Sequence, residues 1–185
     1  KRVLLVDTDL RKPKVHKTLN LPAEPGISNV LTQQEPLANA ISKIEGFDSL
    51  DIVPCGVIPP NPAELLGSQQ LETFIKSIED QYDYMIFDTP PVSLVADTSV
   101  LSRMLDGIVL VIAYGRTVKE TAMFAKESLD SVNAKIIGCV FNRVKADSYG
   151  NRGYYRRYGS KYGYRYGYKR GYGYRSYGYK YYGSY

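Results

Sequence analysis

The chain begins Lys1-Arg2-Val3-Leu4-Leu5-Val6-Asp7-Thr8-Asp9-Leu10-Arg11, an apolar run followed by two aspartates and a cation. A short unbroken apolar run predicts a strand buried on both faces. Open α/β sheets bind ligands beyond the carboxyl ends of their strands, which is where Asp7 and Asp9 would lie. In extended geometry both carboxylates would point the same way and would repel unless a cation lay between them. The alternative is an Asx turn that closes the strand and leaves both acids in solvent.

A second apolar strand also ends in an acid. Tyr84-Met85-Ile86-Phe87-Asp88 precedes Thr89-Pro90-Pro91, and the prolines end the hydrogen-bonding ladder. Two such strands can place Asp7, Asp9 and Asp88 around one ion. Magnesium prefers a few carboxylates completed by water and phosphate oxygens, so this trio predicts a magnesium–nucleotide site.

The rest of the body alternates between apolar strands and helices. We expect strands at 50–53, 108–113 and 136–141, and helices at 13–20, 27–31, 37–44, 68–79, 97–104 and from 117 onward. The connection at 59–66 is stiffened by prolines and leads into a helix. Ser68 and Asp97 are the expected N-caps, and Thr117 and Glu120 have the spacing of a capping box. This order predicts an α/β fold, a mostly parallel twisted sheet with helices on both faces.

Charge and composition divide the chain into a body, residues 1–148, and a tail, residues 149–185. The body contains 15 Lys or Arg against 19 Asp or Glu, whereas the tail contains nine Lys or Arg and no acid. The basic excess therefore belongs to the tail and does not predict a nucleic-acid-binding body. The sequence has no apolar run as long as a membrane span, and we expect no signal peptide in it. Cys55 and Cys139 lack metal-ligand spacing, and we expect Cys139, inside an apolar strand, to be a buried reduced thiol.

The tail holds 15 of the 18 tyrosines and has no Val, Ile, Leu or Met. Without aliphatic residues it cannot form a core, so we expect it to be disordered. Interleaved Arg and Tyr can stack on single-stranded nucleic acid, and a condensate-forming segment is a further alternative.

Three features together resemble one family. Val3–Arg11 resembles the second aspartate motif of the bacterial tyrosine kinases of the P-loop class, and Met85–Pro90 resembles their Walker B motif. The tail resembles their autophosphorylated tyrosine cluster. Related partitioning ATPases share either aspartate motif, but all three features in this order favour the kinases. The resemblance implies a P-loop NTPase-like fold, ATP and Mg²⁺ as cofactors, and phosphoryl transfer to tail tyrosines.

The resemblance also implies residue roles. Asp9 and Asp88 would hold or orient the magnesium ion, in part through water, and Asp7 would accept the tyrosine proton, although Asp7 and Asp9 could exchange roles. Asn142, followed by Arg143, would contact the adenine edge, and a turn residue is the alternative for Asn142. The expected phosphate acceptors are Tyr154, Tyr155, Tyr158, Tyr162, Tyr164, Tyr166, Tyr168, Tyr172, Tyr174, Tyr177, Tyr179, Tyr181, Tyr182 and Tyr185.

One part expected of such a site does not occur in these 185 residues. Nucleotide folds of this type cradle the phosphates with a Gly-rich loop that ends in Gly-Lys-Ser/Thr. In the family this loop lies on the preceding strand-to-helix turn, roughly 30 residues upstream, the size of one βαβ unit. We therefore expect the isolated chain to bind ATP poorly and to be inactive by itself.

By resemblance, such kinases regulate capsular or extracellular polysaccharide production at the cytoplasmic face of the membrane. The expected partners are further copies in a ring, a membrane adaptor or polysaccharide co-polymerase domain, in the same chain or separate, and a tyrosine phosphatase. Nucleic acid is not an expected partner. Two other hypotheses stay open: a partitioning or positioning ATPase of the same fold, and an interaction protein whose tail binds RNA or another polyanion.

Overall fold

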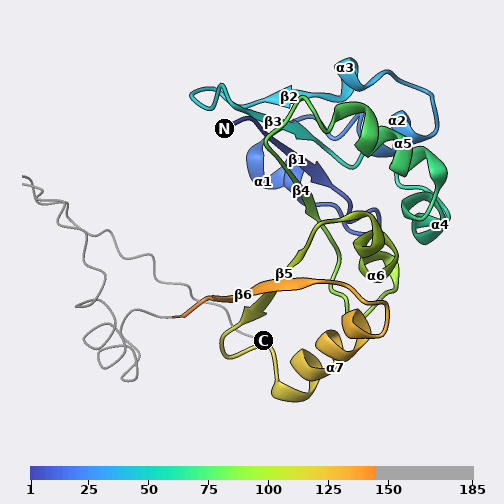
Figure 1. The fold of residues 1–185 in the computed structure, drawn as a ribbon. Coiled ribbons are helices and arrows are strands. Elements are labelled where there is room, and N and C mark those ends of the chain that lie inside the picture. The colour runs from blue at the N-terminus through green and yellow to red at the C-terminus, as the bar shows by residue number, and fades with distance from the viewer. Residues whose placement is uncertain (145–185) are drawn as a thin grey trace, which may run out of the picture. The chain divides into compact units, whose positions relative to one another are not determined.

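A computed structural model describes residues 1–144, which begin with a strand and then alternate between helices and strands (Figure 1). The elements are β1 Val3–Asp7, α1 Val15–Leu19, α2 Ile27–Leu31, α3 Leu37–Ala40, β2 Ser42–Lys43, β3 Leu50–Val53, α4 Pro62–Leu66, α5 Gln69–Ile78, β4 Tyr84–Asp88, α6 Asp97–Leu101, a 3₁₀ turn η1 Ser102–Met104, β5 Ile108–Ala113, α7 Lys119–Asp130 and β6 Ile136–Asn142. The expected tail lies outside the described residues.

β1 is the central strand of the larger sheet, whose order is β2-β3-β1-β4. It runs parallel to β3 and to β4, and only the short edge strand β2 is antiparallel. β5 and β6 form a separate parallel pair. Parallel strands connected through helices confirm the predicted α/β class.

The core lies between β1 and three helices. Leu4 and Val6, on one face of β1, are fully buried, whereas Val3 and Leu5 on the opposite face are only partly buried. The expected burial on both faces is therefore complete on one face only. Helices α2, α4 and α5 contribute the facing side chains Ile27, Leu31, Leu66, Leu71, Phe74 and Ile78. Each fully buried side chain of this size contributes roughly 1.5–3 kcal/mol of transfer free energy. The strand that ends in Asp7 is thus anchored in the core, as is the neighbouring β3 through Ile52 and Val53.

Helix α5 confirms the predicted amphipathic helix and its cap. The hydroxyl of Ser68 accepts a hydrogen bond from the Leu71 N–H at 3.4 Å and donates one to the Leu65 carbonyl at 2.7 Å. Of the predicted apolar face, Leu71, Phe74 and Ile78 are buried.

Three local predictions are wrong. The helix expected at 37–44 ends at Ala40, because Ile41 is extended (φ −76°, ψ 124°) and residues 42–43 pair with β3. Val118, not Thr117, is the N-cap of α7, because the Thr117 hydroxyl instead accepts the Ala113 N–H at 3.1 Å. Asp97 is the first residue of α6 and does not cap it, because its carboxylate binds an arginine from the β1 loop.

The apolar strands β5 and β6 are less covered than their composition predicts. Val109 and Val111 of β5 and Phe141 of β6 are each more than half exposed. Cys139 is exposed as well, so the expectation of a buried thiol is wrong for this residue. Cys55 is buried, and desolvation followed by the charges of the nearby aspartates raises the pKa of its thiol to about 12.

Candidate functional site

The carboxyl ends of β1 and β4 bring two predicted site residues together. In the parallel register of these strands, Asp7 lies opposite Asp88. Thr8 connects the ends of β1 and β4, because its backbone N–H and its hydroxyl both donate hydrogen bonds to the Asp88 carbonyl, at 2.8 and 2.7 Å. No pattern in the sequence predicts this contact of Thr8. The expected meeting of the two strand-end aspartates at one edge of the sheet is present.

Asp7 is fully buried beyond the last residues of the strand. Its Oδ1 accepts the Asp9 N–H at 3.2 Å, and its Oδ2 accepts the Val15 N–H at 3.1 Å. Burial raises the pKa of the Asp7 carboxyl, the charge of Asp9 adds to the rise, and the backbone donors oppose it. Asp7 therefore retains a proton more readily than an ordinary carboxyl.

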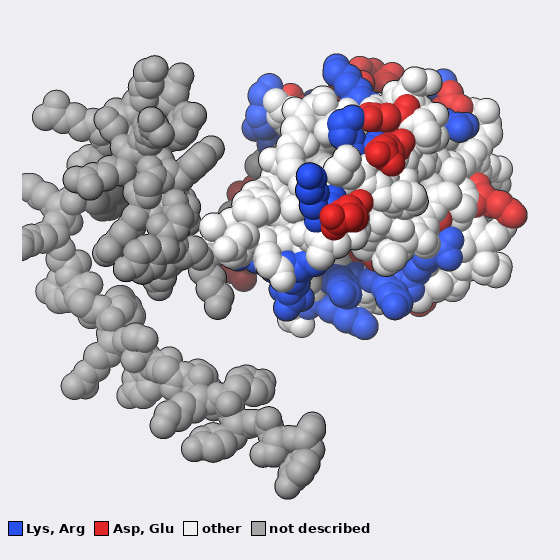
Figure 2. Space-filling model, turned by 90° about the horizontal axis from the view of Figure 1, so that it is seen from below, with Lys and Arg blue, Asp and Glu red and all other residues white. Residues whose placement is uncertain are grey.

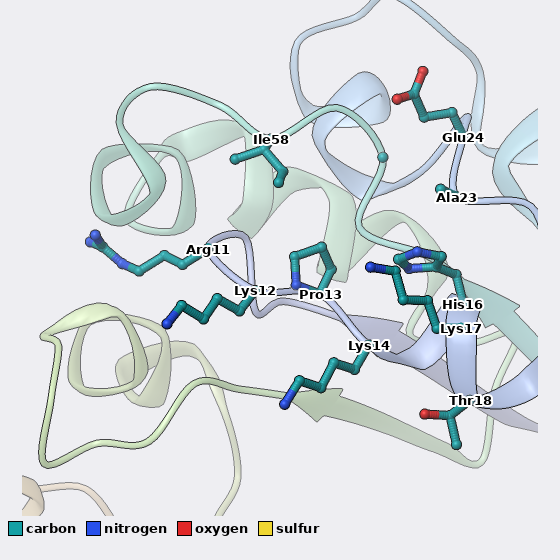
Figure 3. A pocket seen from close by; sticks show the side chains of 11 residues that line it. Arg11, Lys12, Pro13, Lys14, His16, Lys17, Thr18, Ala23, Glu24 and Ile58 are labelled. Atoms are coloured by element: carbon teal, nitrogen blue, oxygen red, sulfur yellow. The ribbon is translucent and has the colours of Figure 1, made fainter. Parts of the chain in front are cut away.

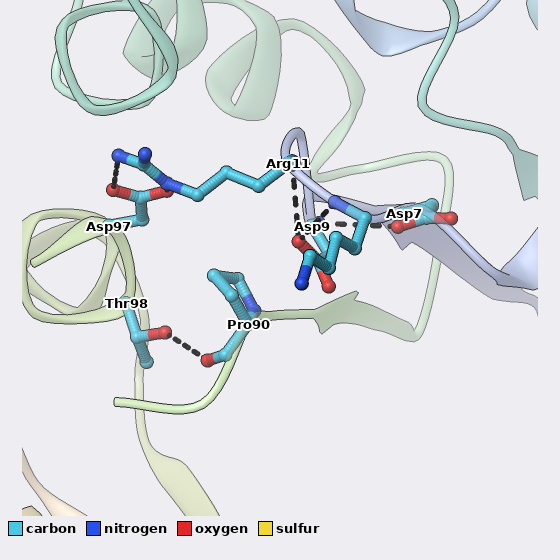
Figure 4. Close-up of polar contacts among 7 residues, drawn as sticks. Asp7, Asp9, Arg11, Pro90, Asp97 and Thr98 are labelled. Atoms are coloured by element: carbon cyan, nitrogen blue, oxygen red, sulfur yellow. Dashed lines mark hydrogen bonds and ion pairs between the residues drawn. The ribbon is translucent and has the colours of Figure 1, made fainter. Parts of the chain in front are cut away.

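Asp9 does not point the same way as Asp7, because β1 ends at Asp7 and the alternation of side chains along an extended strand ends with it. Its Oδ1 accepts the Arg11 N–H at 3.3 Å and the Lys12 N–H at 3.0 Å, as in an Asx turn (Figure 4). No hydrogen bond to Oδ2 of Asp9 is present within residues 1–144. The Asx turn, which was the alternative for both aspartates, is therefore present at Asp9. Asp7, by contrast, is buried and does not reach solvent.

Asp88 is exposed, and its carboxylate has no hydrogen bond or salt bridge within the described part of the chain. Desolvation, and then the negative charges of Asp7 and Asp9, raise the pKa of its carboxyl. A pKa raised by neighbouring anions means that a cation placed among them would lower the electrostatic energy of the site.

The donor set fits a hard divalent cation in part. Asp9 and Asp88 offer free carboxylate oxygens, the ligands that magnesium prefers. No group of three or more His, Cys, Asp or Glu side chains is closed around one point within residues 1–144. A magnesium ion held by Asp9 and Asp88 would therefore complete its shell with water and phosphate oxygens.

An ion pair that the sequence did not predict fixes the loop after β1. The Arg11 guanidinium donates two hydrogen bonds to the fully buried Asp97 carboxylate, from Nε at 2.7 Å and from Nη2 at 2.9 Å (Figure 4). The Thr98 hydroxyl, next along α6, donates to the Pro90 carbonyl at 2.8 Å. The loops that follow β1 and β4 are therefore both tied to the start of α6.

Asn142 and Arg143 lie at the end of β6. The Asn142 side-chain oxygen accepts the Arg143 N–H at 2.7 Å, and Arg143 adopts a left-handed backbone conformation (φ 62°). This is the geometry of a turn. Within the described residues no hydrogen bond or ion pair joins either residue to the three aspartates. The tail tyrosines expected to accept phosphate lie outside the described residues.

The chain matches known proteins in both sequence and fold. Residues 1–125 match a family model described as an AAA domain. The chain is 41% identical over 155 residues to the tyrosine-protein kinase YwqD of Bacillus subtilis, covering 84% of this chain and 65% of YwqD. It is 32% identical over 158 residues to the putative tyrosine-protein kinase CapB of Staphylococcus aureus, covering 85% of this chain and 68% of CapB. The crystal structure of the chimerical protein CapA2B2 superimposes with a TM-score of 0.74 at 34% identity, covering 77% of this chain and 62% of that one.

Sheet order, strand-end aspartates and the family match define a domain of the P-loop NTPase-like class. Within that class, the chain belongs to the bacterial tyrosine-protein kinases. It spans about two thirds of the length of the curated relatives YwqD and CapB. None of the helices in residues 1–144 is long and apolar enough to cross a membrane.

Proposed function

We propose that the intact protein is an ATP-dependent tyrosine autokinase that phosphorylates the tyrosines of its own tail. The observation that carries this proposal is the register of β1 and β4, which sets Asp7 opposite Asp88 with Asp9 two residues beyond. The raised pKa values of the Asp7 and Asp88 carboxyls suit a cation-dependent transfer of an anionic group.

Asp9 and Asp88 are the proposed magnesium ligands, directly or through water. Their support is that each has carboxylate oxygens free of protein donors within residues 1–144, whereas both oxygens of Asp7 accept backbone N–H groups. When bound, the ion neutralises charge on the phosphate oxygens during transfer. The protein's own contribution is to hold one carboxylate at the end of β4 and the other in the turn that follows the adjacent strand β1.

Asp7 is the proposed acceptor of the tyrosine proton. Burial raises the pKa of its carboxyl toward the range in which a carboxylate is an effective base. Asp9 is the alternative, because it is only half-buried and reaches solvent more easily. The pH dependence of the rate separates the two, because replacing the true base removes the acid limb of the profile.

The phosphate-binding loop is proposed to come from residues outside this sequence. β4 pairs only with β1 among the described strands, so its second edge is free to accept another strand. A strand on that edge would end beside Asp88, where a Gly-rich loop could reach the phosphates.

The proposed setting is the control of capsular or extracellular polysaccharide production, consistent with the kinase relatives. The proposed partners are further copies that present tails to one another, a membrane adaptor, and a phosphatase. The proposed location is the cytoplasmic side of the membrane. Asn142 and Arg143 remain the proposed contacts to the adenine.

The test is product analysis of the intact protein with ATP and Mg²⁺. We expect phosphotyrosine in residues 149–185, located by mass spectrometry, and its loss when Mg²⁺ is chelated. Release of inorganic phosphate without phosphotyrosine would contradict the proposal and favour a partitioning-type ATPase. Salt-sensitive RNA binding without phosphotyrosine would favour the interaction protein.

A further inference from the structure

A groove of about 850 Å³ follows directly from the site loop. It is lined by residues 11–14 and 16–18 of the loop and helix after β1 and by Ala23, Glu24, Gly56 and Ile58 (Figure 3). The backbone N–H of Lys12, at its edge, donates to Asp9. The groove therefore adjoins the carboxylate cluster but is built from different side chains.

The groove concentrates positive charge in an otherwise acidic body. Residues 11–17 carry four Lys or Arg and no acid, while the rest of residues 1–148 carry 11 Lys or Arg against 19 acids. Figure 2 shows Lys and Arg side chains gathered along the lower edge of the face in view, with further charges of both signs scattered over it. Arg11 is neutralised by Asp97. Lys12, Lys14 and Lys17 are exposed and form no salt bridge within residues 1–144, and Glu24 is the one acid that lines the groove there.

Apolar side chains lie among these cations. Pro13 lies between Lys12 and Lys14 in the sequence, and Ala23 and Ile58 from neighbouring segments also line the groove (Figure 3). Ile58 is 56% exposed. An apolar surface next to several free ammonium groups suits a ligand that has a flat ring and a dianion at its end.

We infer that this groove binds phosphotyrosine of the phosphorylated tail, from the same chain or from a second copy. The inference rests on the proposed function, because that reaction makes the ligand. The unmodified tail carries nine cations and no acid, so the groove repels it. Each phosphotyrosine adds a charge of about −1.5 to −2 at pH 7 and three strong acceptor oxygens, which reverses the interaction.

Binding of the product next to the site has a consequence for the reaction. Many tail tyrosines are separated by a single residue, as in Tyr162-Gly163-Tyr164. Two residues of extended chain span only about 7 Å. If a phosphorylated tyrosine is held in the groove, whose edge contacts Asp9 through the Lys12 N–H, the neighbouring tyrosines lie only a few residues from the carboxylate cluster. The inference therefore predicts repeated phosphorylation of one tail.

The test uses the intact protein, dephosphorylated and without ATP, and three labelled peptides that span residues 162–168. One carries phosphate on Tyr164, one is unmodified, and one has phosphoserine at that position. By fluorescence anisotropy at fixed salt we expect the phosphotyrosine peptide to bind at least about tenfold more tightly than the unmodified one, and more tightly than the phosphoserine peptide, which lacks the ring.

A matched pair of variants locates the binding. Lys14→Gln with Lys17→Gln should weaken phosphotyrosine-peptide binding about tenfold. Lys119→Gln with Lys135→Gln removes the same charge from exposed lysines outside the groove and should change binding less than twofold.

Equal losses of peptide affinity in both variants, or equal binding of the phosphotyrosine and unmodified peptides, would overturn the inference. The inference would also be overturned if the Lys14→Gln, Lys17→Gln variant kept peptide binding but lost binding to phosphatidylglycerol vesicles. That result would mean that the groove binds a membrane surface. Because the peptides are synthetic, an inactive kinase would count against the proposed function and leave this result standing.

Discussion

Arg11 and Asp97, 86 positions apart, form a two-bond ion pair in which the carboxylate is fully buried. The pair connects the loop after β1 with the first residue of α6, and the guanidinium fork matches the carboxylate in a way that a lysine ammonium cannot. We predict that Arg11→Leu lowers the unfolding temperature of the intact protein by about 5 °C, because it leaves a buried charge unpaired.

The matched comparison is the double variant Arg11→Leu with Asp97→Asn, which removes the charge together with its partner. It should recover part of the lost unfolding temperature, measured by calorimetry. An Arg11→Leu protein as stable as the wild type would show that the pair is not formed in solution.

A second prediction follows from the raised pKa of Asp88. A carboxyl whose pKa is raised in the folded state binds its proton more tightly there than in the unfolded chain. Its contribution to stability is therefore most favourable below its ordinary pKa of 3.8 and is lost as the pH rises through the raised value. Without Mg²⁺ and ATP, Asp88→Asn should therefore raise the unfolding temperature at pH 7, and the gain should vanish toward pH 3.8. A gain of equal size at both pH values would contradict the electrostatic explanation. Adding Mg²⁺ and ATP should stabilise the wild type more than the variant.

Close backbone approach at Gly26 gives a third prediction. A Cβ on Gly26 would lie 2.2 Å from the Gly56 backbone nitrogen and 2.3 Å from the Pro54 carbonyl oxygen. Gly26→Ala should therefore cost about 3 kcal/mol in the free energy of unfolding. Gly138→Ala is the control, because a Cβ there meets nothing within 4 Å. Similar chemical denaturation midpoints for the two variants would refute the predicted clash.

The sequence predicted the centre of the molecule better than its periphery. β1 and the capped helix α5 follow from local patterns, namely an unbroken apolar run and an i, i+3, i+4, i+7 face, which need no knowledge of distant residues. The meeting of Asp7 and Asp88 also follows, because parallel strands bring their carboxyl ends to one edge.

The features that the sequence did not predict depend on contacts between residues far apart in the chain. Nothing near Asp97 indicates that its carboxylate binds Arg11 and not the helix N-terminus, and the exposure of Cys139 depends on what covers β6. The basic groove was missed because Lys12, Lys14 and Lys17 resemble an ordinary solvated charge run until the segments around Ala23 and Ile58 are placed against them.

A fourth prediction concerns the tail. Removing residues 149–185 should leave the unfolding temperature of the body nearly unchanged, because the removed segment has no Val, Ile, Leu or Met to bury. Scanning calorimetry of the truncated and intact proteins at equal concentration makes the comparison. A fall of several degrees would mean that the tail packs against the body.

The most direct test of the proposed site is the initial rate of phosphotyrosine formation in the intact protein with ATP and Mg²⁺. Asp9→Asn and Asp88→Asn keep the side-chain shape and remove the charge that the metal needs, so each should lower the rate at least about a hundredfold while the protein stays folded. Asp106→Asn removes an exposed carboxylate elsewhere and should leave the rate unchanged. Wild-type rates in both site variants would contradict the assignment of Asp9 and Asp88 to a magnesium-dependent phosphoryl transfer.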